Sequence, residues 1–170
     1  IRLIILLIGF LISCTDDKSI FETPPTDPDN GGLILPEGFG ALVVADSVGP
    51  ARHLAVNSNG DIYIKLRIDT GDNGNMALRD TNGDGKADIF KSFGDYPNDG
   101  RFATEMKIHN EYLYYSSELV VYRQKLDPNK LIPIGKPEVI MVDEYPIRWH
   151  NAKSLAFDNK GRIYCSVYSI

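Results

Sequence analysis

Three stretches of the chain share one pattern, in which an apolar run is followed by a polar turn and by a second apolar run. They are residues 52–66, 104–116 and 148–167. In the third stretch, Leu155, Ala156 and Phe157 precede the turn Asp-Asn-Lys-Gly, and the β-rich run from Ile163 follows it. Two apolar runs joined by a turn of this composition predict a β-hairpin. The sequence therefore predicts three hairpins of one design.

The three hairpins recur at a period of about fifty residues. Their apolar leads are Leu54, Met106 and Leu155, which lie 52 and 49 residues apart. Their tyrosines, Tyr63, Tyr114 and Tyr164, lie 51 and 50 residues apart. A repeat of about 40–50 residues that carries only strand signals is typical of a β-propeller blade of four strands.

The segments between the hairpins supply further strand signals and no helix. The additional apolar runs are residues 76–79, 87–93, 119–122 and 137–142. No window of a dozen residues after position 33 keeps apolar residues at a 3.6 period. We therefore predict an all-β fold, a β-propeller that closes with about 4–8 blades when complete. About two and a half blades are present, and the chain is expected to be a fragment of a longer protein. The alternative is an open β-sandwich with a coincidental repeat.

Composition narrows the class of protein. The chain has 170 residues, 43% hydrophobic and 24% charged, which indicates a globular protein with a core. Its net charge of -5 gives no basic footprint for nucleic acid. We expect an extracytoplasmic protein with a small or neutral partner and no nucleic-acid partner.

Residues 1–14 predict a lipoprotein signal peptide. Arg2 precedes ten uncharged residues, 3–12, which is the length of a signal-peptide apolar region and too short for a stable membrane span. The tetrad that ends at Cys14 resembles the bacterial lipobox, in which the cysteine is diacylated. Such a lipid would anchor the protein to a bacterial membrane, expected to be the outer one. The alternative is an ordinary buried cysteine in a truncated helix.

The rest of the chain divides into a tether and a folded domain. Residues 15–34 are rich in Thr, Asp, Pro and Gly, a composition that cannot bury a core and that predicts a disordered tether. Residues 35–170 are predicted to form the propeller blades, with residues 41–45 as the first strand. Cys165 lies in an apolar strand without a visible disulfide partner, which favours a buried, inert thiol.

An acidic loop at residues 80–88 is a candidate calcium site. Its sequence matches the opening of an EF-hand loop, but position twelve is Lys91 where an EF-hand needs glutamate. The alternative is a turn whose Asp and Asn side chains cap their own backbone. In either case a structural role is expected rather than a catalytic one. The candidate oxygen ligands are Asp80, Asn82, Asp84, the carbonyl of Lys86, and Asp88.

Cationic and histidine side chains gather where the hairpins begin. Arg52 and Lys153 each lie two residues before an aligned apolar lead. Because the inner strand of each propeller blade lines the central channel, cations at this position would face a shared anionic ligand. His150 precedes the third hairpin, and a neutral imidazole there would accept a proton from a hydroxyl. The alternative is a solvated turn residue. His53, in the first inner strand, and His109, in a turn, are weaker candidates.

These residues together resemble the glucose/sorbosone dehydrogenase family, which comprises six-bladed propellers of the soluble quinoprotein type. The resemblance rests on the segments 51–63, 78–88 and 150–158, in that order and spacing. It runs from about Leu35 to Val167. Two departures are Trp149, where relatives often have an acidic or polar residue, and the run 168–170 in place of a Gly-containing loop.

The resemblance implies an oxidoreductase of carbohydrate metabolism. It implies the cofactor pyrroloquinoline quinone (PQQ), held by cations such as Arg52 and Lys153 and by Ca²⁺. It further implies a small sugar substrate oxidised at a hydroxyl or a hydrated aldehyde, an external electron acceptor, and His150 as general base. Because a fold hosts many functions, the alternative is a non-catalytic cell-surface propeller that binds glycan or protein.

Overall fold

The structure is a computed structural model that describes residues 25–67, 74–94, 105–143 and 153–166. In these residues the regular structure is β, apart from one short 3₁₀ turn, η1, at Asn30–Gly32. The part of the chain that is described contains no helix long and apolar enough to cross a bilayer. The prediction of an all-β chain is confirmed.

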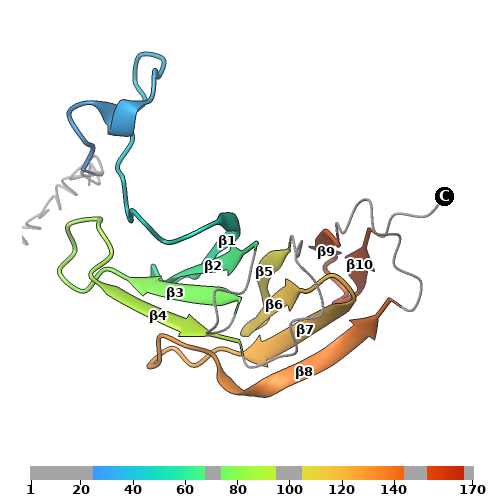
Figure 1. Ribbon diagram of the computed structural model, residues 1–170. Helices are drawn as coiled ribbons and strands as arrows, with labels where there is room; N and C mark the ends of the chain where they lie inside the picture. Colours follow the sequence, from blue (N-terminus) through green and yellow to red (C-terminus); the bar gives the residue numbers. More distant parts are fainter. Residues whose placement is uncertain (1–24, 68–73, 95–104, 144–152, 167–170) are drawn as a thin grey trace, which may run out of the picture.

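The strands form two four-stranded antiparallel sheets and one hairpin (Figure 1). The first sheet has the order β1-β2-β3-β4 and the second β5-β6-β7-β8, while β9 pairs with β10. The strands are β1 (Ala51–Val56), β2 (Ile62–Leu66), β3 (Asn75–Arg79), β4 (Ile89–Phe93), β5 (Met106–His109), β6 (Tyr112–Ser116), β7 (Val120–Lys125), β8 (Ile134–Val142), β9 (Leu155–Phe157) and β10 (Ile163–Cys165).

The pairing register confirms that the three hairpins are equivalent. Leu54 lies opposite Ile64, Met106 opposite Tyr115, and Leu155 opposite Cys165. The repeated tyrosines each stand one residue before these partners. Because side chains alternate between the two faces of a strand, the tyrosines all point to the same side of their sheets.

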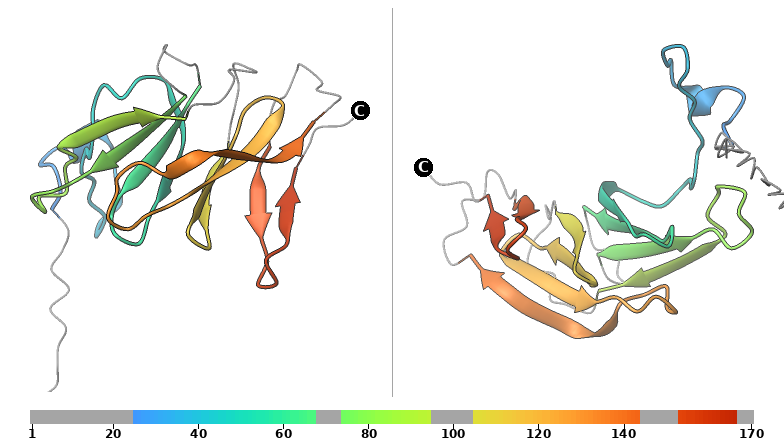
Figure 2. Two further views of the ribbon diagram at one scale, coloured as in Figure 1. Left: turned by 90° about the horizontal axis from the view of Figure 1, so that it is seen from below. Right: turned by 180° about the vertical axis from the view of Figure 1, so that it is seen from behind.

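The first strands of the three sheets lie next to one another. Contacts join β1 to β5 and β5 to β9, while β4 and β8 lie at the far edges of their sheets (Figure 1; Figure 2). We call β1, β5 and β9 the inner strands. The three sheets thus spread from a common line, and each presents one face to the next.

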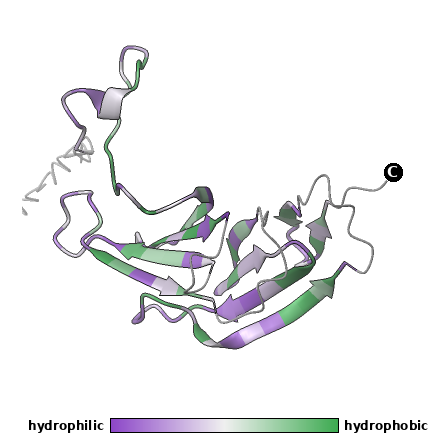
Figure 3. Ribbon diagram, in the orientation of Figure 1, coloured by the Kyte–Doolittle hydropathy of each residue, from purple (hydrophilic) through white to green (hydrophobic). Residues whose placement is uncertain are grey.

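The core fills the spaces between neighbouring sheets. Between the first and second sheets, Phe93 packs edge-on against Tyr63 and Tyr115, with ring centroids 6.0 and 6.5 Å apart. Between the second sheet and the hairpin, Tyr114 and Val121 pack with Leu155. Figure 3 shows the strands as alternating hydrophobic and hydrophilic segments, as half-buried strands require. Burial of these side chains supplies the main stabilisation of the fold.

The segment before β1 differs from its prediction. Residues 41–45 form no strand, although they are extended and apolar. Their backbone groups bond instead to other loops, with Ala87 N donating to Val44 O at 2.8 Å and Asp27 N donating to Ala41 O at 2.8 Å. Residues 25–34, within the predicted tether, therefore bond to this segment. Residues 1–24, which include Cys14 and the predicted signal peptide, lie outside the described residues.

A pair of valines in the second sheet tests the inter-sheet packing. Val121 on β7 is 1% exposed and packs against Leu155 of the β9–β10 hairpin, whereas Val139 on β8 is 58% exposed. We expect Val121→Ala to lower the free energy of unfolding by about 2 kcal/mol, from lost apolar burial and a residual cavity. Val139→Ala should cost less than about 1 kcal/mol. Urea unfolding of the two variants measures both values, and equal losses would contradict the packing described above.

Candidate functional site

The residues directly before the aligned apolar leads meet at the starts of the inner strands. These residues are His53, Glu105 and Ser154. His53 Nδ1 lies 3.6 Å from Glu105 Oε1, and Glu105 Oε2 accepts a hydrogen bond from Leu155 N at 2.8 Å. One carboxylate from the second sheet thus connects the first strands of all three sheets.

Glu105 satisfies backbone groups that the sheets themselves leave open. Ser166 N donates to Ser154 O, so the N–H of the next residue, Leu155, points away from β10 and needs another acceptor. Glu105 supplies it, and its other oxygen accepts the N–H of Met106 at 3.0 Å. Glu105 is only 4% exposed. A buried carboxylate that accepts two backbone N–H bonds is held in one orientation.

Lys107, two residues along the same strand, reinforces this junction. Its Nζ donates to Leu155 O at 3.2 Å. The N–H and the C=O of Leu155 are therefore both bonded by side chains of the second sheet. The start of β9 is fixed to β5 by polar contacts as well as by packing.

Further buried charges surround this point. Lys153, 3% exposed, donates to Asp143 Oδ2 at 2.7 Å, and Lys65, 2% exposed, lies opposite His53 in the β1–β2 register. Burial of a charge is costly unless the charge is paired. We refer to five residues as the inner-strand cluster: His53, Lys65, Glu105, Asp143 and Lys153. Besides His53, the cluster holds two basic side chains, Lys65 and Lys153, and two acidic ones, Glu105 and Asp143, and Lys153 and Asp143 form an ion pair.

The two cations that the sequence predicts as cofactor ligands lie in different surroundings. Arg52 is exposed on β1 and, with His53, lines a pocket of about 350 Å³. Its guanidinium has no hydrogen-bond or ion-pair partner among the described residues. Lys153 is buried and bonded to Asp143. Arg52 is thus available to an anionic ligand, whereas the charge of Lys153 is already balanced.

The histidines differ in their surroundings. His53 is 43% exposed, so its ring reaches both Glu105 and solvent. His109 is the last residue of β5 and stacks on Phe157, with centroids 4.2 Å apart; its Nε2 is buried without a hydrogen-bond partner in the described part of the chain. His150, the predicted general base, lies outside the described residues.

Cys165 is half-buried in the interface between the second sheet and the hairpin. Burial raises the pKa of its thiol, so the nucleophilic thiolate is disfavoured.

The Asp80 loop connects β3 to β4 and caps its own backbone. Asp80 accepts N–H bonds from Asn82, Gly83 and Gly85 at 3.1, 2.7 and 2.8 Å. The pKa of this carboxyl is held below its usual value, chiefly by the hydrogen bond from Gly85 N. This arrangement is the Asx-type turn that stands as the alternative to a calcium site.

The remaining predicted calcium ligands serve the same turn. Asp84 accepts the N–H of Lys86, and the Asp88 carboxylate accepts from the backbone and hydroxyl of Thr81. Lys86 Nζ reaches Asp27 at 3.0 Å and so links the loop to the N-terminal segment. No group of three or more His, Cys, Asp or Glu within the described ranges is arranged to hold a metal ion. The side-chain oxygens of Asp80, Asn82, Asp84 and Asp88 accept hydrogen bonds from donors of the loop itself.

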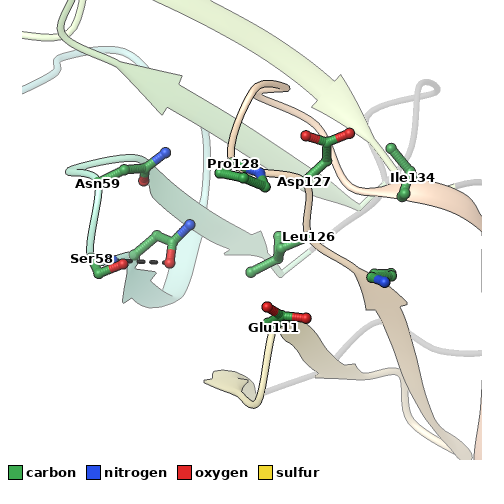
Figure 4. A pocket seen from close by; sticks show the side chains of 9 residues that line it. Ser58, Asn59, Glu111, Leu126, Asp127, Pro128 and Ile134 are labelled. Carbon is green, nitrogen blue, oxygen red and sulfur yellow. Dashed lines mark hydrogen bonds between the residues drawn. The ribbon is translucent and has the colours of Figure 1, made fainter.

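The opposite end of the inner strands carries a second pocket, of about 430 Å³ (Figure 4). The hairpin turn after β1 and the loop after β7 line it. Several of its polar side chains cap local turns: Asn57 accepts from Ser58 N, Asn59 from Asp61 N, and Asp127 from Asn129 N. At this end Asp61 is buried and its charge is paired with Arg79. The other end holds three buried charged residues, Lys65, Glu105 and Lys153, so we place the candidate site at the starts of the inner strands.

Comparison with known proteins supports the fold. The sequence matches no known family and no curated protein. A similar solved structure is the holo form of the PQQ domain of pyranose dehydrogenase from Coprinopsis cinerea, with a TM-score of 0.54 and 13% sequence identity. The match covers 69% of this chain and 27% of that one. The chain folds as part of a β-propeller. The chain spans about a quarter of the neighbour's length, and the number of blades in the complete protein stays a prediction.

The Asp80 loop makes a testable contribution to acid stability. Because the folded-state pKa of Asp80 is lowered from 3.8, its contribution is present above that value and is lost as pH falls through the folded pKa. We expect Asp80→Asn to lower Tm at neutral pH. Below about pH 4 the Tm of the wild type should fall more steeply than that of the variant, which has no carboxylate to protonate at this position. Thermal melts across the acid range test this. The control is Asp84→Asn, which removes a carboxylate that accepts one backbone N–H. An equal change of Tm in both variants would contradict the role of Asp80.

Proposed function

We propose that this chain contributes blades to a PQQ-dependent sugar dehydrogenase. The observation that carries the proposal is a cluster of buried charges and a half-exposed histidine where the inner strands begin, in a propeller fold shared with a PQQ domain. Active sites combine positioned polar groups of this kind with a rigid scaffold. The fold likeness alone does not carry an activity.

The described residues fit the cofactor in one respect. PQQ carries carboxylates, and the exposed guanidinium of Arg52 is an uncommitted partner for such an anion. Bound PQQ would supply a two-electron acceptor for hydride. Lys153 would act indirectly, since its bond to Asp143 fixes the start of β9. The Asp80 loop has no role in this chemistry because it lies on an outer connection.

His150 is proposed as the general base. Hydride leaves a carbon readily only when the attached oxygen is losing its proton, so a base within hydrogen-bond reach of the hydroxyl is required. His150 lies five residues before Leu155, whose N–H and C=O are both held by the second sheet.

Reconstitution of the full-length protein with PQQ and Ca²⁺ tests the proposal. We expect aldose-dependent reduction of an artificial dye that requires PQQ, with sorbosone as a second substrate. His150→Ala should abolish turnover while PQQ remains bound, which absorbance after gel filtration measures. Dye reduction without added cofactor by a protein free of PQQ would contradict the proposal. Failure of the folded wild type to bind PQQ would favour the alternative, a surface propeller that binds glycan or protein.

We further propose that Cys14 carries a lipid that anchors the propeller to the extracytoplasmic face of a bacterial membrane, expected to be the outer membrane. The support is the short apolar run that ends at this cysteine. Cys14→Ser should move the protein from the membrane fraction to the soluble fraction, because acyl chains contribute about 0.8 kcal/mol per buried CH₂. Fractionation and immunoblotting measure this. Full membrane retention of the variant would overturn the assignment.

A further inference from the structure

We propose that His53 is a hydroxyl-binding residue of the site and that Glu105 is its positioning residue. The proposal rests on the proposed function for the identity of the ligand, a neutral sugar. It assigns a role to a histidine and a carboxylate that face each other across the junction of the first and second sheets.

The geometry of Glu105 is the first support. Its carboxylate is almost fully buried and is fixed by two backbone N–H groups, from Met106 and Leu155. It therefore cannot turn away from His53 without leaving strand N–H groups unsatisfied, which is costly in a buried place. The oxygen that faces His53 is held in position whether or not a ligand is present.

The orientation of the imidazole is the second support. The His53 atom nearest to Glu105 is Nδ1, at 3.6 Å. This distance exceeds that of a formed hydrogen bond, but such contacts commonly tighten when a ligand binds. A carboxylate beside Nδ1 favours the tautomer with the proton on that nitrogen, which leaves Nε2 as an acceptor. An acceptor nitrogen on a half-exposed ring is suited to a ligand O–H group.

The charge of the surroundings identifies the ligand class. Within the inner-strand cluster Lys153 is paired with Asp143, and the formal charges of Lys65 and Glu105 are equal and opposite. The buried part of the site therefore has no excess charge to attract an anion or a cation. A neutral polyhydroxylated ligand, such as an aldose, satisfies an acceptor nitrogen without upsetting this balance.

The repeat supplies the third support. His53 and Glu105 occupy equivalent positions in successive sheets, directly before Leu54 and Met106, and the third sheet has Ser154 there. The backbone demands no particular side chain at this position, because three different residues occupy it. Glu105 serves the fold through its bond from Leu155 N, but that bond requires no imidazole opposite the carboxylate. His53 is therefore the member of the pair that belongs to the site rather than to the fold.

The test uses the full-length protein with ¹⁵N-labelled histidine and four forms: wild type, His53→Gln, Glu105→Gln and the double variant. Ring nitrogen shifts report the tautomer of His53, and titration with glucose reports contact at Nε2. We expect glucose to shift Nε2 of His53 in the wild type, and Glu105→Gln to abolish the single tautomer. Gluconate, an anion of similar size, is the control ligand.

Kinetics distinguish positioning from a structural effect. We expect His53→Gln to raise KM for the aldose about tenfold, the value of one well-formed hydrogen bond to a ligand, with an unchanged Tm. Glu105→Gln should raise KM in the wild-type background but not in the His53→Gln background, because it acts through the imidazole. The Tm of Glu105→Gln should fall, because the glutamine side chain has only one acceptor oxygen for the N–H groups of Met106 and Leu155.

Three results would overturn the proposal: an unchanged KM in His53→Gln, an additive effect of the two substitutions, or a response of His53 to gluconate but not to glucose. If the wild type binds no PQQ and oxidises no aldose, the proposed function fails, and the glucose titration of His53 still decides whether this residue binds a sugar hydroxyl. His53→Gln keeps the proposal testable if Glu105→Gln does not fold, since His53 is partly exposed.

Discussion

The carboxylate of Glu105 is the contact on which the arrangement of the second sheet and the β9–β10 hairpin depends. Sheets that spread from a common line leave N–H and C=O groups unpaired along their first strands, and those groups need partners when they are buried. Glu105 pairs with an N–H of its own strand and with Leu155 N on the next, and Lys107 bonds the adjoining carbonyl. Apolar packing alone would bring the sheets together without fixing their relative height. These directional bonds fix it.

The structure divides its interactions between two regions. Away from the strand starts, the sheets meet through aromatic and aliphatic side chains such as Phe93 and Leu113, whose burial is favourable but non-directional. At the strand starts, the contacts are charged and directional, with Lys153 and Asp143 2.7 Å apart. Chemistry requires atoms held to within a fraction of an ångström. The polar region is therefore where a catalytic or binding site gains most from the fold.

The sequence predicted the repeat because the repeat is a local property. A two-residue period and a turn determine each hairpin, so aligned residues such as Leu54 and Met106 take equivalent pairing positions. Residues 41–45 show the limit: an apolar, extended run becomes a strand only if an edge is available, and its partners are loop atoms. Glu105 was missed for the same reason. Two of its contacts, with His53 and with Leu155 N, lie about fifty residues away in the sequence. The second is to a backbone N–H, which cannot be inferred from the residue type. A carboxylate next to an apolar lead was the available signal.

A repeated backbone makes a specific site only when its equivalent positions differ in side chain. Inner strands of successive sheets bring the same repeat position together, so three identical residues there would produce either like-charge repulsion or an inert lining. The chain instead places histidine, glutamate and serine at this position. The repeated fold brings these three positions close together. The differences between the sheets then give the three positions an imidazole, a carboxylate and a hydroxyl. The Asp80 loop lies on an outer connection of the first sheet, away from this repeat position, and the Asp80 carboxylate bonds the backbone of its own turn.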